Sequence, residues 1–313
     1  MKYLFLLSGV FLGWGLGAND SANIFGTAVY SKVIRYWTAV FLTSLFVVLG
    51  AYLEGAKGIG KLNSFALAHQ VNSLNEAFLV ALSAALTVFV MTTFRLPVST
   101  SQAIIGAILS NGMLHGHLDL KITLQFVSSW VVTPIGAMLI TMILYRLTRQ
   151  YIEKKLTNFR FFRNFLTLGY LFSGIFAAYS LGANNVANVF GVFPLEEYDF
   201  SLKFIGLLGG LTIAFGVLTY SKPVMSTIGK GIVPLSEVTG LLVVIGTAIT
   251  LYLYAQVGIP VSSSQAVVGA VIGIGILQGY ELIEIDVVKR IFIGWIMTPL
   301  TSAVLSYVVL TLF

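Results

Sequence analysis

A polar segment that occurs twice in an apolar chain is the feature that most restricts the fold. Residues 17–27 read Gly-Ala-Asn-Asp-Ser-Ala-Asn-Ile-Phe-Gly-Thr, and residues 182–192 repeat seven of these eleven positions at an offset of 165. The first copy follows a run, residues 3–16, that is almost free of polar groups, so we expect its carboxylate and amides at hydrocarbon depth. A charge there is costly and is by default functional. The two copies differ most where Asn185 replaces Asp20.

The apolar segments around these copies predict an all-α polytopic membrane protein. Hydrophobic residues make up 57% of the chain and charged residues 10%, with a mean hydropathy of +0.92, which excludes a soluble globular fold. A transmembrane barrel would alternate in short segments instead. The expected segments lie near 3–17, 20–31, 37–53, 75–94, 97–113 and 121–145, and near 166–182, 184–193, 202–220, 236–257, 260–277 and 288–312.

Four of these segments are shorter than the roughly 20 residues of a full crossing. They are residues 20–31 and 184–193 and the runs that begin at Pro97 and Pro260, and they predict half-helices or re-entrant pieces. Irregular backbone at membrane depth is tolerated only where protein or a watery cavity surrounds it. We therefore expect these breaks to converge on one site.

Two further pairs of segments extend the duplication over the chain. Residues 97–107 match residues 260–270 at eight of eleven positions, and the Trp-x-x-Thr-Pro sequence at 130–134 returns at 295–299. This predicts two homologous transmembrane repeats, 1–145 and 166–313, joined by a basic linker at 146–165. Duplicated halves with interrupted segments are typical of secondary transporters that bind substrate at the midplane. Inversion of the halves requires an odd number of crossings in each, which the segment count leaves open.

The linker carries most of the net charge of +6. Between Arg146 and Arg163 six basic side chains oppose only Glu153, which gives +5. Short loops rich in Lys and Arg stay in the cytoplasm. We interpret the linker as a solvated cytoplasmic loop and not as a nucleic-acid surface, and we expect the protein in the cell membrane.

The runs after Pro97 and Pro260 predict a site for an oxyanion. Proline suits the first turn of a helix, and the hydroxyls that follow can cap it, so each run should start a helix inside the membrane. The unpaired N–H groups and partial positive charge of a helix N-terminus favour an anion. The candidate substrate ligands are Ser99, Thr100, Ser101 and Gln102, together with Ser262, Ser263, Ser264 and Gln265. The alternative is that these hydroxyls only satisfy backbone carbonyls between packed helices.

The Asn and Asp residues of the duplicated segment suit a cation. Sodium prefers oxygen ligands, which Asp20, Asn19, Asn23 and carbonyls freed near Gly17 could supply. A proton carried on Asp20 would serve the same purpose, and no other cofactor is implied. The alternative is that the asparagines merely bridge helices.

Together these paired segments resemble the inorganic phosphate transporter (PiT) family, which also includes bacterial sulfate permeases. The resemblance implies an inverted-repeat fold, often a homodimer, with both termini outside and sodium- or proton-coupled uptake of an inorganic anion. It also implies that the ion and substrate region contains Asn19, Asp20, Asn23, Asn184, Asn185 and Asn188. We assign Asn185 to the substrate and the others to the coupling ion. Phosphate members usually carry a second aspartate where this chain has Asn185, which leaves phosphate only slightly ahead of sulfate.

These patterns leave three hypotheses about function. A coupled oxyanion symporter with alternating access comes first, a passive anion channel second, and an intramembrane enzyme third, because no convincing nucleophile–base pair or metal cluster is evident. Residues 55–61 fit part of a phosphate-binding loop, but Leu62 stands where a Ser or Thr belongs, so we interpret them as a flexible loop. His115 and His117 lack a third metal ligand and are expected to be loop residues.

Overall fold

The computed structural model describes residues 2–94, 98–155, 159–228 and 232–313, and within these ranges all regular structure is helical. The helices are α1 (Leu6–Asp20), α2 (Ala22–Tyr30), α3 (Tyr36–Glu54), α4 (Ala56–Ala68), α5 (Leu74–Thr93), α6 (Thr100–Leu114), α7 (Leu120–Lys155), α8 (Phe159–Asn185), α9 (Ala187–Phe190), α10 (Leu202–Ile228), α11 (Glu237–Val257), α12 (Ser263–Gln278) and α13 (Ile285–Leu312). Short 3-10 turns cover Lys2–Phe5, Leu195–Glu197 and Tyr280–Leu282. Pro97, which the sequence placed at the start of a helix, lies outside the described residues.

Seven helical segments of the described chain are long and apolar enough to cross a membrane. They are Tyr36–Glu54, Leu74–Thr93, Leu120–Thr148, Phe162–Phe190, Leu202–Lys222, Glu237–Val257 and Ile285–Leu312. Their outer faces expose large apolar side chains, for example Leu124 and Leu139 of α7 and Val304 of α13. Such a surface is stable in contact with lipid and not with water. The prediction of an all-α multi-span membrane protein is therefore confirmed.

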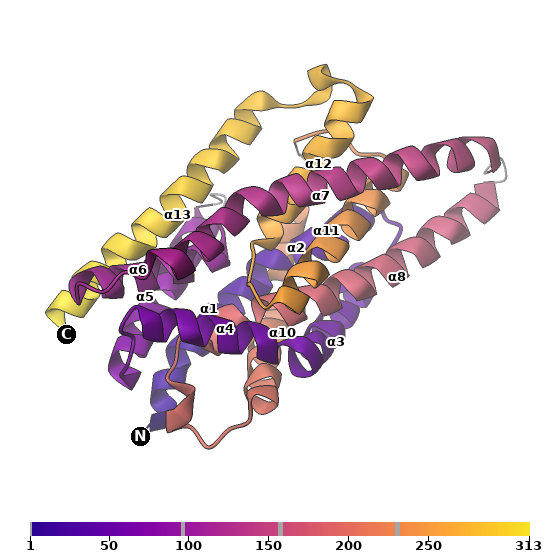
Figure 1. Ribbon diagram of the computed structural model, residues 1–313. Coiled ribbons are helices and arrows are strands. Elements are labelled where there is room, and N and C mark those ends of the chain that lie inside the picture. Colours follow the sequence, from indigo (N-terminus) through magenta and orange to yellow (C-terminus); the bar gives the residue numbers. More distant parts are fainter. Residues whose placement is uncertain (1, 95–97, 156–158, 229–231) are drawn as a thin grey trace.

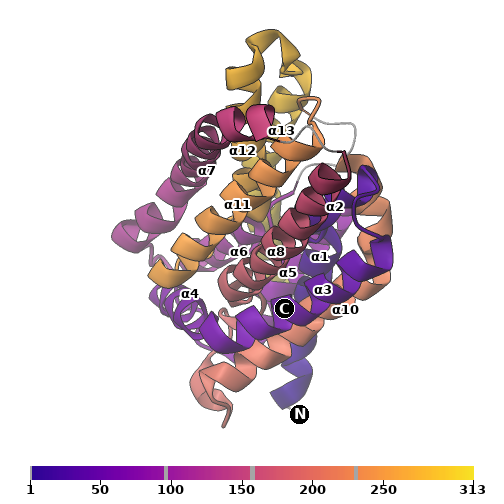
Figure 2. The same cartoon turned by 90° about the vertical axis from the view of Figure 1, so that its right-hand side faces the viewer.

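Helices from the two ends of the sequence pack against each other. α1 lies along α10, α3 along both α8 and α10, α6 along α13, and α7 along α12. Figure 2 shows α11, α8 and α3 side by side, and Figure 1 shows both termini at the same end of the molecule. The end of α7 and the start of α8 lie at the opposite end (Figure 1).

Glycines permit close approach between these helices, and one pair occupies equivalent positions in the two halves. A Cβ at Gly106 would overlap the carbonyl of Pro299, and a Cβ at Gly269 would overlap the carbonyl of Pro134. These glycines are equivalent in the two segments that follow Pro97 and Pro260. Small residues of this kind let membrane helices approach through their backbones. Each short helix is thus held directly against the long helix that ends the other half.

Both short helices that the sequence predicted after Pro97 and Pro260 are present. α6 has 15 residues and α12 has 16, and each begins with a serine cap. The Ser99 hydroxyl accepts from the Gln102 N–H at 3.3 Å, and the Ser262 hydroxyl accepts from the Gln265 N–H at the same distance. The caps form because serine in an extended conformation places its oxygen over the open first turn.

The helix breaks in the duplicated Asn segments disturb the backbone less than the sequence suggested. Ser21, between α1 and α2, and Val186, between α8 and α9, both keep helical torsion angles. α9 has only four residues, so no separate half-helix covers 184–193. The prediction was wrong there because a polar motif can interrupt hydrogen bonding locally while the chain keeps its helical course.

Two other regions are more helical than expected. Residues 56–68, which include most of the expected flexible loop, form α4, and α4 packs on α9 and α11. The expected loop at 146–165 is also largely helical, because α7 continues to Lys155 and α8 begins at Phe159. Lys, Arg, Gln and Glu are good helix formers, so a helix can continue beyond the apolar segment that predicts it.

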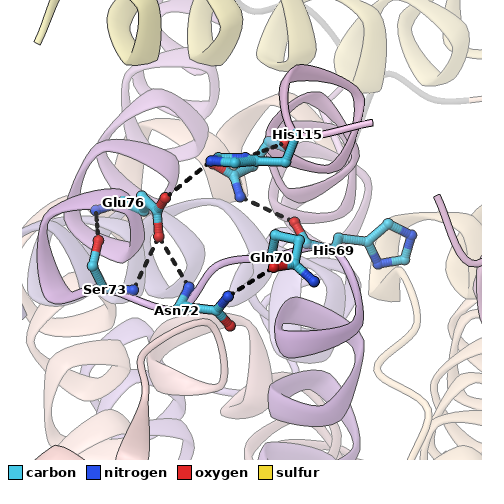
Figure 3. Close-up of polar contacts among 7 residues, drawn as sticks. His69, Gln70, Asn72, Ser73, Glu76 and His115 are labelled. Carbon is cyan, nitrogen blue, oxygen red and sulfur yellow. Dashed lines mark hydrogen bonds and ion pairs between the residues drawn. The ribbon is translucent and has the colours of Figure 1, made fainter. Parts of the chain in front are cut away.

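A polar network ties α4, α5 and α6 together (Figure 3). Glu76 closes a capping box with Ser73 at the start of α5, and its other carboxylate oxygen lies 3.4 Å from His115 Nε2 at the end of α6. Asn111 of α6 donates to the carbonyl of His69, the residue after α4, at 3.0 Å. His115 therefore follows α6 as predicted, but it has a structural partner. This network holds the far end of the helix whose start carries Ser99 to Gln102.

Candidate functional site

The first Asn segment ends α1 with a buried carboxylate. Asp20, which is 4% exposed, accepts hydrogen bonds on both oxygens: Oδ2 from the Ser263 hydroxyl at 2.7 Å and Oδ1 from the Asn19 amide at 2.8 Å. Asn23, one turn later in α2, donates to the Ser263 hydroxyl oxygen at 3.3 Å. The break between α1 and α2 thus docks on the start of α12. The donors to this carboxylate among the described residues, Ser263 and Asn19, are neutral.

The second Asn segment makes the corresponding contact with α6, using an amide in place of the carboxylate. Asn185 Oδ1 accepts from the Ser101 hydroxyl at 3.4 Å and from Asn188 Nδ2 at 3.1 Å. Asn188 Nδ2 also donates to the Ser101 oxygen at 2.9 Å. All three side chains are buried.

The two Asn segments and the two short helices therefore meet crosswise. The segment of the first half contacts α12 of the second half, and the segment of the second half contacts α6 of the first half. A 3.4 Å hydrogen bond from the Ser264 hydroxyl to the carbonyl of Val98 brings the starts of the two short helices together. The convergence that the sequence predicted for these four elements is present in the structure.

Asn184 bonds to backbone groups instead of to these side chains. Its Oδ1 accepts from the Val261 N–H at 2.9 Å, and its Nδ2 donates to the Ile259 carbonyl at 3.1 Å. Both contacts are with the backbone that leads into α12. Asn19, its counterpart in the first segment, bonds to Asp20 instead.

Several buried polar atoms at the site have no hydrogen-bond partner among the described residues. They are Ser21 Oγ, Thr100 Oγ1, Gln102 Oε1, Asn185 Nδ2, Asn188 Oδ1 and Gln265 Oε1. A buried polar group without a partner costs roughly 1–3 kcal/mol, so unpaired atoms usually mark a place for a ligand or water. The Thr100 hydroxyl and the Asn185 amide can donate to an anion. The oxygens of Gln102, Asn188 and Gln265 can accept from a proton donor or bind a cation.

The starts of α6 and α12 add backbone donors to these side chains. The first turn of a helix leaves N–H groups without helical partners and carries a partial positive charge. The Ser99 and Ser262 caps satisfy the N–H groups of Gln102 and Gln265. The remaining donors suit an anion without an arginine or lysine. The arrangement therefore combines one carboxylate with two neutral, donor-rich helix ends.

Sequence reasoning missed three parts of this site. They are the Ser21 hydroxyl, which is buried without a partner among the described residues, and two sets of backbone groups. The Val98 carbonyl accepts from Ser264, and the backbone on either side of Pro260 bonds to Asn184. Ser21 offered a signal, because it lies between two predicted ligands, Asp20 and Asn23. The backbone groups offered none, since every residue type carries them.

Paired helical halves whose polar breaks meet in one buried site define a multi-pass membrane transporter. The chain belongs to the Phosphate transporter family, whose sequence profile matches residues 16–168 and again residues 155–306. The double match supports the internal repeat, and membership confirms a membrane permease and excludes the intramembrane enzyme. The resemblance noted from the paired segments is thereby confirmed.

Curated relatives cover nearly the whole chain. The sulfate permease CysP of Bacillus subtilis is 31% identical over 318 residues, which cover 100% of this chain and 88% of that protein. A protein of Methanocaldococcus jannaschii that is named as a phosphate permease is 27% identical over 308 residues, 97% of this chain and 95% of that protein. Relatives of this family thus carry the names of two different tetrahedral anions.

A solved structure shares the fold. The structure titled "The sodium-dependent phosphate transporter" superposes with a TM-score of 0.83 at 23% identity, covering 98% of this chain and 97% of that chain. At this identity the likeness concerns the arrangement of the helices.

Proposed function

We propose that the protein is a secondary active transporter that takes up inorganic phosphate by symport with sodium or protons. The observation that carries the proposal is the Asp20 carboxylate, buried against the donor-rich start of α12. The hydroxyl of Ser263, a proposed anion ligand, donates to Asp20, the proposed cation ligand. Binding of either ion must therefore affect binding of the other. The names of the phosphate permease of M. jannaschii and of the sodium-dependent transporter support phosphate and sodium.

The proposed site has two parts. The anion is bound by the starts of the short helices and by one amide, and the coupling cation by the carboxylate and neighbouring amides. The anion ligands are Ser99, Thr100, Ser101, Gln102, Ser262, Ser263, Ser264, Gln265 and Asn185; the cation ligands are Asn19, Asp20, Asn23 and Asn188. The two groups of ligands are hydrogen-bonded to each other, Ser263 to Asp20 and Asn188 to Ser101.

Electrostatics gives the reason for coupling. A bare carboxylate about 4 Å from an anion costs roughly 4 kcal/mol at an effective dielectric constant near 20. A sodium ion or proton on Asp20 removes this repulsion. In the structure the Ser263 hydroxyl donates to the carboxylate. A cation on Asp20 also frees this hydroxyl to donate to the anion. The anion therefore binds more tightly when the cation is bound, and by the same coupling free energy the cation binds more tightly when the anion is bound.

The proposed mechanism needs two repeats of opposite orientation, 1–145 and 166–313, whose short helices begin near the midplane. Both termini lie at one end of the molecule, and the end of α7 and the start of α8 lie at the other (Figure 1), as an odd number of crossings in each half requires. We place the basic α7–α8 end in the cytoplasm and the termini outside. A cysteine at Lys155 in this cysteine-free chain should resist impermeant thiol reagents in intact cells, and ready labelling from outside would contradict this topology.

Sulfate is the second candidate substrate, and Asn185 is the observation that favours it. Sulfate carries no proton at neutral pH, so it needs donors and gains nothing from a second carboxylate. Asn185 Nδ2 is a buried donor without a partner in the described structure. The 31% identity with the sulfate permease of B. subtilis agrees with this alternative.

Uptake by reconstituted protein tests both candidates. Proteoliposomes should accumulate radiolabelled phosphate when an inward sodium or proton gradient is imposed, and sulfate should be measured in parallel under each gradient. Equilibration without accumulation under every gradient would indicate a passive channel. Accumulation of sulfate alone would replace phosphate as the substrate while leaving symport intact.

A further inference from the structure

The side chain of Asn184 holds the backbone on both sides of Pro260. Its oxygen accepts from the N–H of Val261 and its amide donates to the carbonyl of Ile259, and the side chain is buried. The sequence grouped Asn184 with the ligands of the coupling ion. In the structure both ends of its amide are already engaged by backbone.

The segment from residue 258 to residue 262 needs such support. Gly258 ends α11 in the left-handed conformation, with φ of +79°, and Pro260 has no N–H to offer. The N–H of Ile259 turns back to the Tyr254 carbonyl, so the chain reaches α12 without regular hydrogen bonding around Pro260. Backbone groups buried in a membrane protein must find partners. An asparagine amide supplies one donor and one acceptor at the required spacing.

The equivalent residue in the first half has a different role. Asn19 donates to Asp20 Oδ1 at 2.8 Å, so it orients the carboxylate. Asn19 and Asn184 occupy the same place in segments of otherwise similar sequence. Of these two equivalent residues, Asn19 therefore orients the carboxylate and Asn184 holds the start of α12.

We infer that Asn184 is a positioning residue for anion binding and not a ligand of the coupling ion. By fixing residues 259–261 it sets where α12 begins, and thus where the N–H groups and hydroxyls of the first turn of α12 stand for the anion. A site that binds a small anion through neutral donors depends on their positions within about half an ångström. This inference rests on the proposed function and replaces the role that the sequence suggested for Asn184.

Kinetics of two matched variants separate the two roles. In Asn184→Ala the half-saturating concentration of phosphate should rise about tenfold, while that of the coupling cation, measured at saturating phosphate, should change less than about twofold. Asn19→Ala should show the opposite pattern, because its amide orients the Asp20 carboxylate. A rise mainly in the cation requirement of Asn184→Ala would overturn the inference.

A labelling experiment tests the same inference without transport. The chain has no cysteine, so Ile259→Cys can be introduced alone, with Asn184→Ala, or with Asn19→Ala, and its rate of reaction with a small thiol reagent measured in purified protein. We expect labelling to be several times faster with Asn184→Ala and unchanged with Asn19→Ala. Equal rates in all three would contradict the positioning role, even if wild-type protein transports nothing.

A folding defect must be distinguished from the expected effect. If Asn184→Ala is not monodisperse in detergent, Asn184→Ser, which removes less of the side chain, replaces it in both experiments with the same expected directions. If wild-type protein fails to accumulate phosphate or sulfate under any gradient, the proposed function fails. The labelling rates then still decide whether Asn184 holds the start of α12.

Discussion

The two Asn segments form similar contacts with different chemistry. In the first, a carboxylate accepts from a serine of α12 at 2.7 Å; in the second, an amide oxygen accepts from a serine of α6 at 3.4 Å. Asp20 has both oxygens occupied, whereas Asn185 keeps an unpaired amide nitrogen. In both halves, therefore, the Asn segment contacts the start of the short helix of the other half. Under the proposed function, the carboxylate of the first segment binds the cation and the unpaired amide of Asn185 in the second segment binds the anion.

Removal of the charge from the first half should have the largest effect. Asp20→Asn gives both segments an asparagine at this position and leaves no carboxylate among the proposed ligands. We expect gradient-driven uptake to fall at least about a hundredfold, which corresponds to roughly 2.7 kcal/mol. Proteoliposome uptake measures it, with gel filtration as the control for folding. Concentrative uptake at the wild-type rate would remove Asp20 from the coupling mechanism.

The serines that meet the two segments should differ in importance. Ser263→Ala removes a hydrogen bond to a carboxylate, worth about 1.5–3 kcal/mol, and a second bond from the Asn23 amide, whereas Ser101→Ala removes two bonds with neutral amides, worth about 0.5–1.5 kcal/mol each. We expect a reduction in uptake at low cation concentration of about tenfold or more for Ser263→Ala and several-fold for Ser101→Ala. The two variants serve as controls for each other. Equal losses, or a larger loss for Ser101→Ala, would mean that the charge at Asp20 does not distinguish the halves.

The amide of the second half should affect the choice of anion. Phosphate near neutral pH carries at least one proton that a carboxylate can accept, whereas sulfate has none and is repelled. Asn185→Asp should therefore raise the ratio of phosphate to sulfate uptake about fivefold, or roughly 1 kcal/mol.

Competition assays with arsenate, which is protonated like phosphate, provide the control for this comparison. Arsenate should inhibit Asn185→Asp more strongly than sulfate does. An unchanged ratio in a variant that still transports would show that Asn185 does not distinguish the anions by their protons.

The smallest effect is expected at the ends of the hairpins that carry the short helices. The α5–α6 hairpin is joined by Glu76 and His115, whose side chains are 23% and 44% exposed, whereas at the start of α11 Ser236 caps the helix and the Tyr170 hydroxyl donates to the Glu237 carbonyl. A partly exposed contact of this kind, which is an ion pair when His115 is protonated, contributes up to about 1 kcal/mol. Glu76→Gln should lower the thermal midpoint by a few degrees at most and leave the uptake rate nearly unchanged. A severalfold loss of uptake would show that this network controls α6 directly.

Local sequence patterns were sufficient for much of this architecture. Apolar length predicts which segments span the membrane, and the caps at Ser99 and Ser262 form from residues within four positions of each other. The duplicated segments also predicted which side chains converge. These features depend on contacts close in sequence or on composition, so a single chain reveals them. The same locality explains the errors, since α4 and the helical ends of α7 and α8 extend beyond any apolar signal.

Only the tertiary structure decided how the repeated parts are joined. The sequence of the Asn segments does not show that each contacts the short helix of the other half, because Asp20 and Ser263 are separated by 243 positions. Nor does it distinguish Asn19 from Asn184, which stand in nearly identical surroundings along the chain but bond to a carboxylate and to backbone respectively. Side-chain partners across a membrane protein are selected by helix packing, where glycines such as Gly106 and Gly269 allow close approach. A duplicated sequence thus predicts two similar sets of helices and polar segments, and the packing between them determines the partners of each residue.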